Sequence, residues 1–314
     1  MYRHLIFALV AASLSLFSPQ TQAAERLTVL LDWFVNPDHA PLVIAQQRGY
    51  FDDLGLEVEL VAPADPNDPP KLVAAGQADL AVSYQPQLHL QAAQNLPLVR
   101  IGTLVATPLN SLVVLADGPV KSIADLKGRK VGFSVGGFED AVLGRMLQGA
   151  GLTLEDVELV NVNFSLSPAL LSGQVDAVIG AFRNFEVNQL EIEGRPGRAF
   201  YPEEHGVPAY DELIFIAHRD RLDDARLPRF LDAIERAVLF MLNHPEEAWD
   251  DFRRYRAELD DELNKRAWAD TLPRFAKSPA ALDIGRYQRF AEFLLEQKLI
   301  PETLPVERYA IDLP

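Results

Sequence analysis

Apolar runs alternate with stretches of helical periodicity along most of the chain, and this alternation predicts an α/β protein. Strands are expected at 27–31 and 130–135, each followed by a helical pattern. The order strand, helix, strand, helix, strand in each half predicts a parallel sheet with helices on both faces. From Leu227 to Leu242 apolar residues keep a helical spacing, and Pro245 should end that helix because it disfavours helix at the preceding residue.

Two stretches roughly one hundred residues apart share the same pattern, which indicates a duplicated unit. Gly76 to Asp79 (GQAD) is matched by Gly173 to Asp176 (GQVD), and each predicts a helix-ending glycine followed by a short buried strand. The Gly-Leu pair at Gly55 is repeated at Gly151 in the same way. The duplication predicts two α/β lobes of similar construction.

The second repeat is interpreted as an insertion within the first lobe. Apolar runs at 112–115 and 213–217 flank it and are interpreted as the strands that carry the chain across and back. The expected first lobe is therefore discontinuous, 24–112 and 213–314, and the expected second lobe is 113–212.

The N-terminus has the pattern of a signal peptide, predicted over 1–23. Arg3 and His4 precede an uncharged apolar stretch, 5–17, and the first acidic residue is Glu25. That stretch is shorter than the roughly 20 residues needed to span a membrane. The chain contains no Cys, which excludes a lipid anchor on cysteine, disulfides and thiolate metal ligands. We therefore expect an unanchored protein of the periplasm.

Composition narrows the classes of partner. The 314-residue chain is 48% hydrophobic, enough for proper cores, and its formal charge is −16. Such an acidic protein is not expected to bind nucleic acid or anionic lipid, which require clustered Lys and Arg. A neutral or cationic small ligand is compatible with the charge. No cofactor or metal is expected, since the six histidines include no close pair, and a monomer is expected because nothing in the sequence indicates an oligomer.

The candidate site consists of residues that directly follow predicted strands, because ligands of open α/β sheets collect beyond the carboxyl ends of the strands. Aromatic residues dominate these positions, and aromatic faces on both sides of a cleft suit a flat ring. The carboxylate of Glu186 could accept from an exocyclic amine and a protonated ring nitrogen, a pair that an aminopyrimidine offers. The candidate ligand-binding residues are Trp33, Asn36, His39, Tyr84, Phe138, Phe182, Asn184, Glu186 and Tyr210.

The loop at 134–138 supports two further interpretations. It precedes a helix start, a typical anion site, but Glu139 and Asp140 occupy that positive end, so a neutral polar group is expected there. Gly132 to Gly136 also satisfies the G-x-S-x-G pattern, which would make Ser134 the nucleophile of a hydrolase. That alternative lacks an earlier oxyanion segment and is disfavoured.

Several segments resemble a known family, the thiamine-pyrimidine solute-binding proteins related to the fungal pyrimidine synthases. The resemblance covers about 27–275 and is carried by 32–41, 45–51, 76–79, 180–186 and 243–249. It implies the type II periplasmic binding protein fold, an ABC permease and ATPase as partners, and a ligand such as a hydroxymethyl or formylamino pyrimidine. It also implies capture by closure about hinges near 112–116 and 210–214, without a reaction.

Two alternatives within the resemblance stay open. Riboflavin binders and other aromatic-ligand binders share much of the first motif. The synthases carry a lysine shortly after the first Gly-x-x-Asp motif and a cysteine-rich segment, whereas this chain has no lysine near Ser83 and no cysteine. Synthase activity is therefore not expected.

Overall fold

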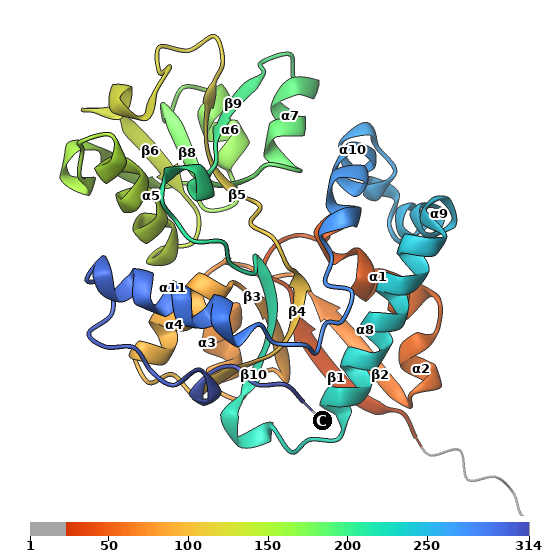
Figure 1. Ribbon diagram of the computed structural model, residues 1–314. Helices are drawn as coiled ribbons and strands as arrows, with labels where there is room; N and C mark the ends of the chain where they lie inside the picture. The colour runs from red at the N-terminus through yellow and green to blue at the C-terminus, as the bar shows by residue number, and fades with distance from the viewer. Residues whose placement is uncertain (1–22, 314) are drawn as a thin grey trace, which may run out of the picture.

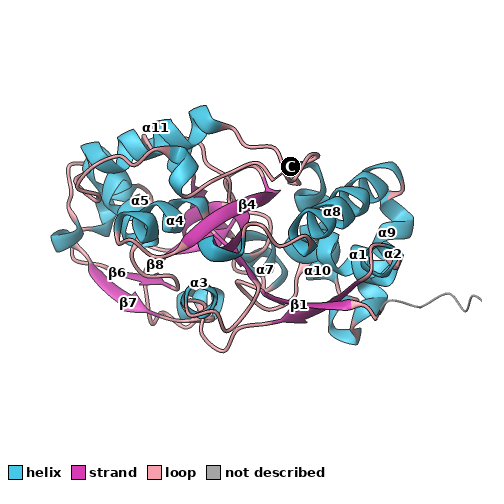
Figure 2. Cartoon of the chain, turned by 90° about the horizontal axis from the view of Figure 1, so that it is seen from below, coloured by secondary structure: helices cyan, strands magenta, loops and turns pink. Residues whose placement is uncertain are grey.

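The computed structural model describes residues 23–313 and has two lobes, each built around one five-stranded sheet (Figure 1). The predicted signal peptide lies outside the described residues except for its last position. Seen from below, β6 and β7 of one sheet lie at the opposite end of the molecule from β1 of the other (Figure 2).

The first lobe contains a sheet with the strand order β2-β1-β3-β10-β4. Its strands are β1 (Glu25–Leu30), β2 (Leu56–Val61), β3 (Leu80–Ser83), β4 (Leu98–Val105) and β10 (Leu213–His218). The helices between them are α1 (Ala40–Gln47), α2 (Tyr50–Asp53), α3 (Pro69–Ala74) and α4 (Gln85–Ala93). The C-terminal helices α8 (Arg226–Asn243), α9 (Pro245–Tyr255), α10 (Glu262–Thr271) and α11 (Ile284–Glu296) complete this lobe.

The second lobe contains a sheet with the matching order β7-β6-β8-β5-β9. Its strands are β5 (Asn110–Leu115), β6 (Lys130–Phe133), β7 (Glu158–Asn161), β8 (Ala177–Phe182) and β9 (Gly197–Phe200). Its helices are α5 (Phe138–Gly149), α6 (Leu166–Leu171) and α7 (Glu186–Ile192).

Neither sheet is wholly parallel, contrary to the simplest prediction. The first three strands of each order pair in parallel, as predicted. The fourth strand, β10 in one sheet and β5 in the other, is antiparallel to both neighbours. These are the strands that the chain forms as it enters a lobe from the other lobe, so they run against the strands made by the local strand-helix-strand units.

The chain passes between the sheets at 106–109 and again at 201–212. The outward passage lies before the predicted hinge at 112–116, because those residues already belong to β5. The return segment holds the outward one: Glu212 Oε2 accepts from the backbone N–H groups of Leu109 (2.5 Å) and Asn110 (2.8 Å). The two passages therefore form one tied connection.

The predicted internal repeat has a structural basis in a turn that recurs in both lobes. Gly76 and Gly173 have φ of 70° and 74°, a left-handed conformation that glycine adopts without strain. Three residues later, Asp79 Oδ2 accepts from Thr28 N (2.9 Å), and Asp176 Oδ2 accepts from Lys130 N (3.0 Å). Each aspartate directly precedes its own strand, β3 or β8, and ties it to the neighbouring parallel strand, β1 or β6.

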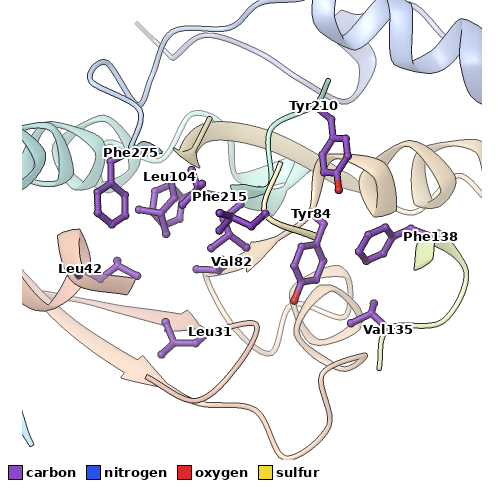
Figure 3. Close-up of a cluster of buried hydrophobic side chains, with 14 of the residues drawn as sticks. Leu31, Leu42, Val82, Tyr84, Leu104, Val135, Phe138, Tyr210, Phe215 and Phe275 are labelled. Atoms are coloured by element: carbon purple, nitrogen blue, oxygen red, sulfur yellow. The ribbon is translucent and has the colours of Figure 1, made fainter. Parts of the chain in front are cut away.

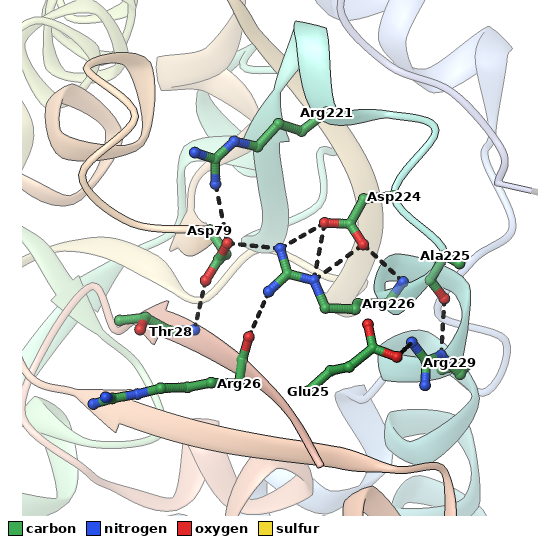
Figure 4. A network of polar contacts seen from close by, with 9 residues as sticks. All are labelled: Glu25, Arg26, Thr28, Asp79, Arg221, Asp224, Ala225, Arg226 and Arg229. Atoms are coloured by element: carbon green, nitrogen blue, oxygen red, sulfur yellow. Dashed lines mark hydrogen bonds and ion pairs between the residues drawn. The ribbon is translucent and has the colours of Figure 1, made fainter. Parts of the chain in front are cut away.

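In the first lobe this aspartate also joins the C-terminal helices to the sheet. Asp79 Oδ1 accepts from Arg221 (3.0 Å) and Arg226 (2.9 Å), and Asp224 binds the same Arg226 side chain (Figure 4). In the second lobe, Asp176 pairs only with Arg129, at 3.1 Å.

The C-terminal helices bury their apolar faces on the first lobe, as the helical periodicity predicts. Trp268 is buried and Trp249 half-buried, and their rings pack 5.6 Å apart. Helix α10 differs from its neighbours because it also packs on α7 of the second lobe.

Candidate functional site

A cavity lies where the carboxyl ends of β1 and β3 face those of β6 and β8. It is small in this arrangement of the lobes: the space in which the centre of a water molecule can sit is about 30 Å³. The first lobe contributes Asp32, Trp33, Asn36, Asp38 and Tyr84. The second contributes Ser134, Val135, Glu139, Leu166, Gly180, Phe182, Phe185 and Glu186. This is the place that the topology of an open α/β sheet assigns to a ligand.

Asp32 is the fixed carboxylate of the first lobe. Its Oδ1 lies 2.9 Å from His39 Nε2, and its Oδ2 accepts from the hydroxyl of Tyr84, also at 2.9 Å. His39 Nδ1 accepts from the backbone N–H of Asn36, which leaves Nε2 as the nitrogen that donates to Asp32. His39 is fully buried behind Asp32 and does not line the cavity, so its predicted contact with the ligand is replaced by support of Asp32.

Asn36 lines the cavity and also shapes its floor. Its Oδ1 accepts from the backbone N–H of Asp38 (2.8 Å), which caps the short 3-10 helix Pro37–His39. This cap is the local reason for an Asn-Pro pair after the strand, because the chain turns at Asn36 to begin the 3-10 helix. Trp33, three residues earlier, lines the cavity. Trp33 packs edge-on against Phe164 of the second lobe, with ring centroids 4.6 Å apart.

Glu139 is one of two carboxyl groups that the second lobe contributes to the cavity lining. It lies in the first turn of α5, and its Oε2 accepts from the backbone N–H of Ser134 at 2.8 Å. A Cβ at Gly180 would lie 2.3 Å from its Oε1, so this glycine, with φ of 91°, is required for the carboxyl group to fit. Burial raises the pKa of Glu139 well above its ordinary value.

Glu186 is the other carboxyl group that the second lobe contributes to the cavity lining, a position that the sequence predicted. It starts α7, and its Oε2 accepts from the backbone N–H of Phe182 at 2.7 Å. Burial raises the pKa of Glu186 to about 7, and repulsion from Asp38 acts in the same direction. Phe182 and Phe185, on either side of this turn, add aromatic surface to the same wall.

Asn184 bridges the lobes and does not line the cavity. Its Nδ2 donates to Asp38 Oδ1 (2.7 Å) and to Thr271 Oγ1 of α10 (2.6 Å). Burial raises the pKa of Asp38 to about 6, although His39 and the Asn184 amide act against this shift. The amide predicted to contact a ligand therefore holds a carboxyl group that does face the cavity.

Phe138 and Tyr210 are both fully buried and also lie outside the cavity lining. Phe138 stacks on Tyr84 with ring centroids 5.0 Å apart, joining α5 to the first lobe (Figure 3). Tyr210 packs on Phe290 of α11 at 5.4 Å. Both were predicted to contact the ligand, and both instead contribute to the apolar contact between the lobes and the C-terminal helices.

A second polar contact closes the opposite edge of the cavity. The side-chain amide of Asn67 donates to the carbonyl oxygen of Ser134 and accepts from the N–H of Gly136, both at 3.2 Å. Asp65 Oδ1 holds that amide in turn, at 2.9 Å. Together with Asn184, this pairing keeps the two lobes in contact on both sides of the cavity.

Ser134 is not arranged as a nucleophile. Its hydroxyl donates to the backbone carbonyl of Asn163, and no hydrogen bond within 23–313 joins it to a histidine. A nucleophile elbow needs a base within hydrogen-bond reach. The hydrolase reading of the G-x-S-x-G pattern therefore has no geometric support.

The sequence did not single out Asp38 or Glu139 as site residues, yet both face the cavity. Acidic residues at a helix start are ordinarily solvated caps, so only their position after a strand end could have marked them. Within 23–313 no cluster of three His, Asp or Glu ligands suits a metal ion. None of the described helices is both long and apolar enough to cross a bilayer.

Solved structures with the same architecture place the fold in a known class. The alkanesulfonate-binding protein of Xanthomonas axonopodis pv. citri bound to MOPS matches with a TM-score of 0.71 over 92% of this chain and 99% of that chain, at 19% identity. A Candida albicans protein described as having the generic periplasmic binding protein fold also matches with a TM-score of 0.71, at 16% identity, over 92% and 96% of the two chains. The chain therefore has the periplasmic binding protein fold, which confirms the predicted fold class.

Sequence relatives define the family within that fold. The chain belongs to the NMT1/THI5-like family, whose model matches residues 36–248. A putative thiamine biosynthesis protein of Haemophilus influenzae is 56% identical over 93% of both chains. The formylaminopyrimidine-binding protein of Halalkalibacterium halodurans is 37% identical, over 77% of this chain and 76% of that protein. A 4-amino-5-hydroxymethyl-2-methylpyrimidine phosphate synthase of Legionella pneumophila is more distant, 27% identical over 87% and 88%. The resemblance found in the sequence is confirmed.

Proposed function

We propose that this protein is the solute-binding component of an ABC importer and that it captures a thiamine-related aminopyrimidine between its lobes. The observation that carries the proposal is the place of Glu186. Its buried carboxyl group lies on a cavity wall that has aromatic side chains from both lobes, among them Trp33, Tyr84 and Phe182. The relative that is named for binding formylaminopyrimidine supports the same ligand class.

The edge of an aminopyrimidine suits Glu186 in either protonation state. A carboxylate accepts from the exocyclic amine and from a protonated ring nitrogen. A neutral carboxyl group accepts from the amine and donates to an unprotonated ring nitrogen. Because the pKa of Glu186 is raised to about 7, one proton shared between ring and carboxyl group maintains both hydrogen bonds near neutral pH.

Capture works by closure of the lobes about the two passages at 106–109 and 201–212. The contacts of Asn67 and Asn184 across the cavity belong to the closed arrangement. The closed form then delivers its ligand to a membrane permease driven by an ATPase. This role requires export of the chain by the predicted signal peptide to the periplasm.

Titration calorimetry tests the proposal with four probes: 4-amino-5-hydroxymethyl-2-methylpyrimidine, its 5-formylaminomethyl analogue, riboflavin and taurine. We expect one pyrimidine to bind per chain, and riboflavin and taurine not to bind. Glu186→Gln should weaken pyrimidine binding by about 1.5–3 kcal/mol, because a charged hydrogen bond becomes a neutral one. Glu193→Gln, an exposed change at the other end of α7, is the matched control and should leave binding unchanged. Binding of riboflavin or taurine without any pyrimidine would refute the proposal.

A growth test addresses the synthase alternative. Some relatives are named as synthases, but this chain has no cysteine and no lysine in the stretch Val82 to Gln85. In a strain that cannot make this pyrimidine, expression of the chain without its predicted signal peptide should not restore growth on medium that lacks the pyrimidine, whereas a synthase would restore it.

A further inference from the structure

Asp38 has an oxygen atom that no described residue satisfies. The residue is 1% exposed and lines the cavity. Its Oδ1 accepts from Asn184 Nδ2 at 2.7 Å, and the Thr271 hydroxyl lies 3.2 Å from the same oxygen. Its Oδ2 is buried and has no hydrogen-bond partner within 23–313. Since neither Asn184 nor Thr271 lines the cavity, the unsatisfied oxygen is the one left to meet a ligand.

The cavity side of Asp38 offers no cation to neutralise it, although His39, which lies behind Asp32 and outside the lining, acts on it from the other side. The cavity lining includes four carboxyl groups and no Lys, Arg or His. Asp32 already has two side-chain donors, and Glu139 accepts from the backbone of the 134–137 loop. Asp38 and Glu186 both line the cavity, from opposite lobes, and the charge of Asp38 raises the pKa of Glu186. A buried, unpaired carboxylate is expensive, so a positive charge between these two groups would be strongly stabilised.

We propose that Asp38 is a specificity-determining residue which, together with Glu186, selects a cationic ligand: an aminopyrimidine that carries a primary ammonium or an equivalent positive group beside its ring. This inference rests on the proposed function and specifies, in addition, that the captured ligand is positively charged. Since Asp38 belongs to the first lobe and Glu186 to the second, a cation held between them also joins the lobes. A neutral pyrimidine would use the Glu186 edge and could donate a hydroxyl or amide hydrogen to Asp38, but it would bring no positive charge to it.

Calorimetry with two probes of the same ring tests the inference: the cation 4-amino-5-aminomethyl-2-methylpyrimidine and the neutral 5-hydroxymethyl compound. The unmodified protein should bind the cation more tightly. Asp38→Asn keeps the shape and an oxygen for Asn184, so it should weaken the cation about 10- to 100-fold and the neutral compound by no more than roughly threefold. Thr271→Val, which removes a hydroxyl that touches Asp38 from outside the cavity, is the control and should change both affinities equally.

The outcomes separate this inference from the proposed function. If the unmodified protein binds neither pyrimidine, the proposed function fails. If it binds the neutral compound as tightly as the cation, or if Asp38→Asn weakens both equally, the assignment of Asp38 fails while the proposed function stands.

A measurement on the unmodified protein covers the case in which Asp38→Asn does not fold. The ratio of the two affinities should rise about tenfold or more between pH 5.5 and 7.5, because Asp38 must lose its proton to pair with the cation. The groups that face Asp38 are Asp32 and His39 from its own segment, Glu186 from α7, and the neutral Asn184 and Thr271. The ring pKa of each free probe is measured separately and its contribution is subtracted, because the ammonium group lowers the ring pKa of the cation. A ratio that stays flat with pH overturns the inference.

Discussion

The two lobes share one sheet topology but differ in the side chains at the carboxyl ends of their strands. Both lobes use the same glycine turn and the same hydrogen bond between an aspartate and the neighbouring parallel strand, β1 or β6. At the strand ends, the first lobe has Asp32, satisfied by His39 and Tyr84, whereas Glu139 and Glu186 of the second lobe accept only backbone N–H groups.

This difference separates a preset wall from a responsive one. Side-chain donors fix the carboxylate of the first lobe before any ligand arrives. The carboxyl groups of the second lobe are buried without such donors, so their charge depends on what enters the cavity. The residues after the strands can differ between the lobes because the backbone hydrogen bonds that hold each sheet together lie within the strands.

The largest expected effect comes from filling the space beside Glu139. Gly180→Ala forces a Cβ into the carboxyl group of Glu139 at a backbone φ of 91°, and we expect a loss of about 2–4 kcal/mol in the free energy of unfolding. Urea denaturation measures it. Gly173→Ala has a similar φ but nothing within 4 Å of its Cβ, so it should cost only about 1 kcal/mol. Equal losses would show that backbone strain alone, and not Glu139, requires glycine at 180.

The pH dependence of stability tests the responsive wall. The pKa of Glu186 is raised to about 7 from 4.5. A raised acid pKa stabilises the fold below the ordinary value and loses that contribution as pH rises through the folded value. The ligand-free protein should therefore lose about 3 kcal/mol of unfolding free energy through Glu186 between pH 4 and 7.5. Glu186→Gln should remove part of this slope, and an unchanged slope in that variant would contradict the assignment.

The construction that the two lobes share is tested by removing the equivalent aspartates. Asp79→Ala should cost about 2 kcal/mol, because it breaks the bond to Thr28 and the contacts with Arg221 and Arg226. Asp176→Ala should cost about 1 kcal/mol, because Asp176 has only Lys130 N and Arg129 as partners. Chemical denaturation of the two variants side by side measures the difference. A larger loss at Asp176 would mean that the C-terminal helices add nothing through Asp79.

A further loss of stability is expected at the preset wall, where Asp32 has two side-chain donors. Tyr84→Phe removes one of the two donors to Asp32 and keeps the stacking on Phe138, so it should lower stability by about 1–2 kcal/mol. Thermal unfolding by circular dichroism measures this change. A neutral result would indicate that water or His39 alone satisfies Asp32.

The fold and part of the site could be predicted from the sequence. The repeat and the periodicity depend on local patterns, and they predicted the two sheets and their helices, whereas the family was identified from the resemblance of particular segments. Trp33, Tyr84, Phe182 and Glu186 were found because strand ends in such sheets meet at one cavity.

The remaining site residues depend on side-chain directions and on distant partners. The role of Asn184 is set by Thr271, a residue of the C-terminal helices that no local pattern connects to it. Phe138 follows a strand like the others, but its ring turns toward Tyr84 and not into the cavity. Asp38 was overlooked because its burial results from the cap at Asn36 and the closure of the second lobe over it.

A crystal structure of the protein with 4-amino-5-hydroxymethyl-2-methylpyrimidine tests the central claim most directly. We predict the ring in the cavity between the lobes, in contact with aromatic side chains of both, with its amine and ring nitrogen about 2.7–3.2 Å from the carboxyl oxygens of Glu186. A ring bound outside this cavity, or inside it without contact to Glu186, would contradict the account.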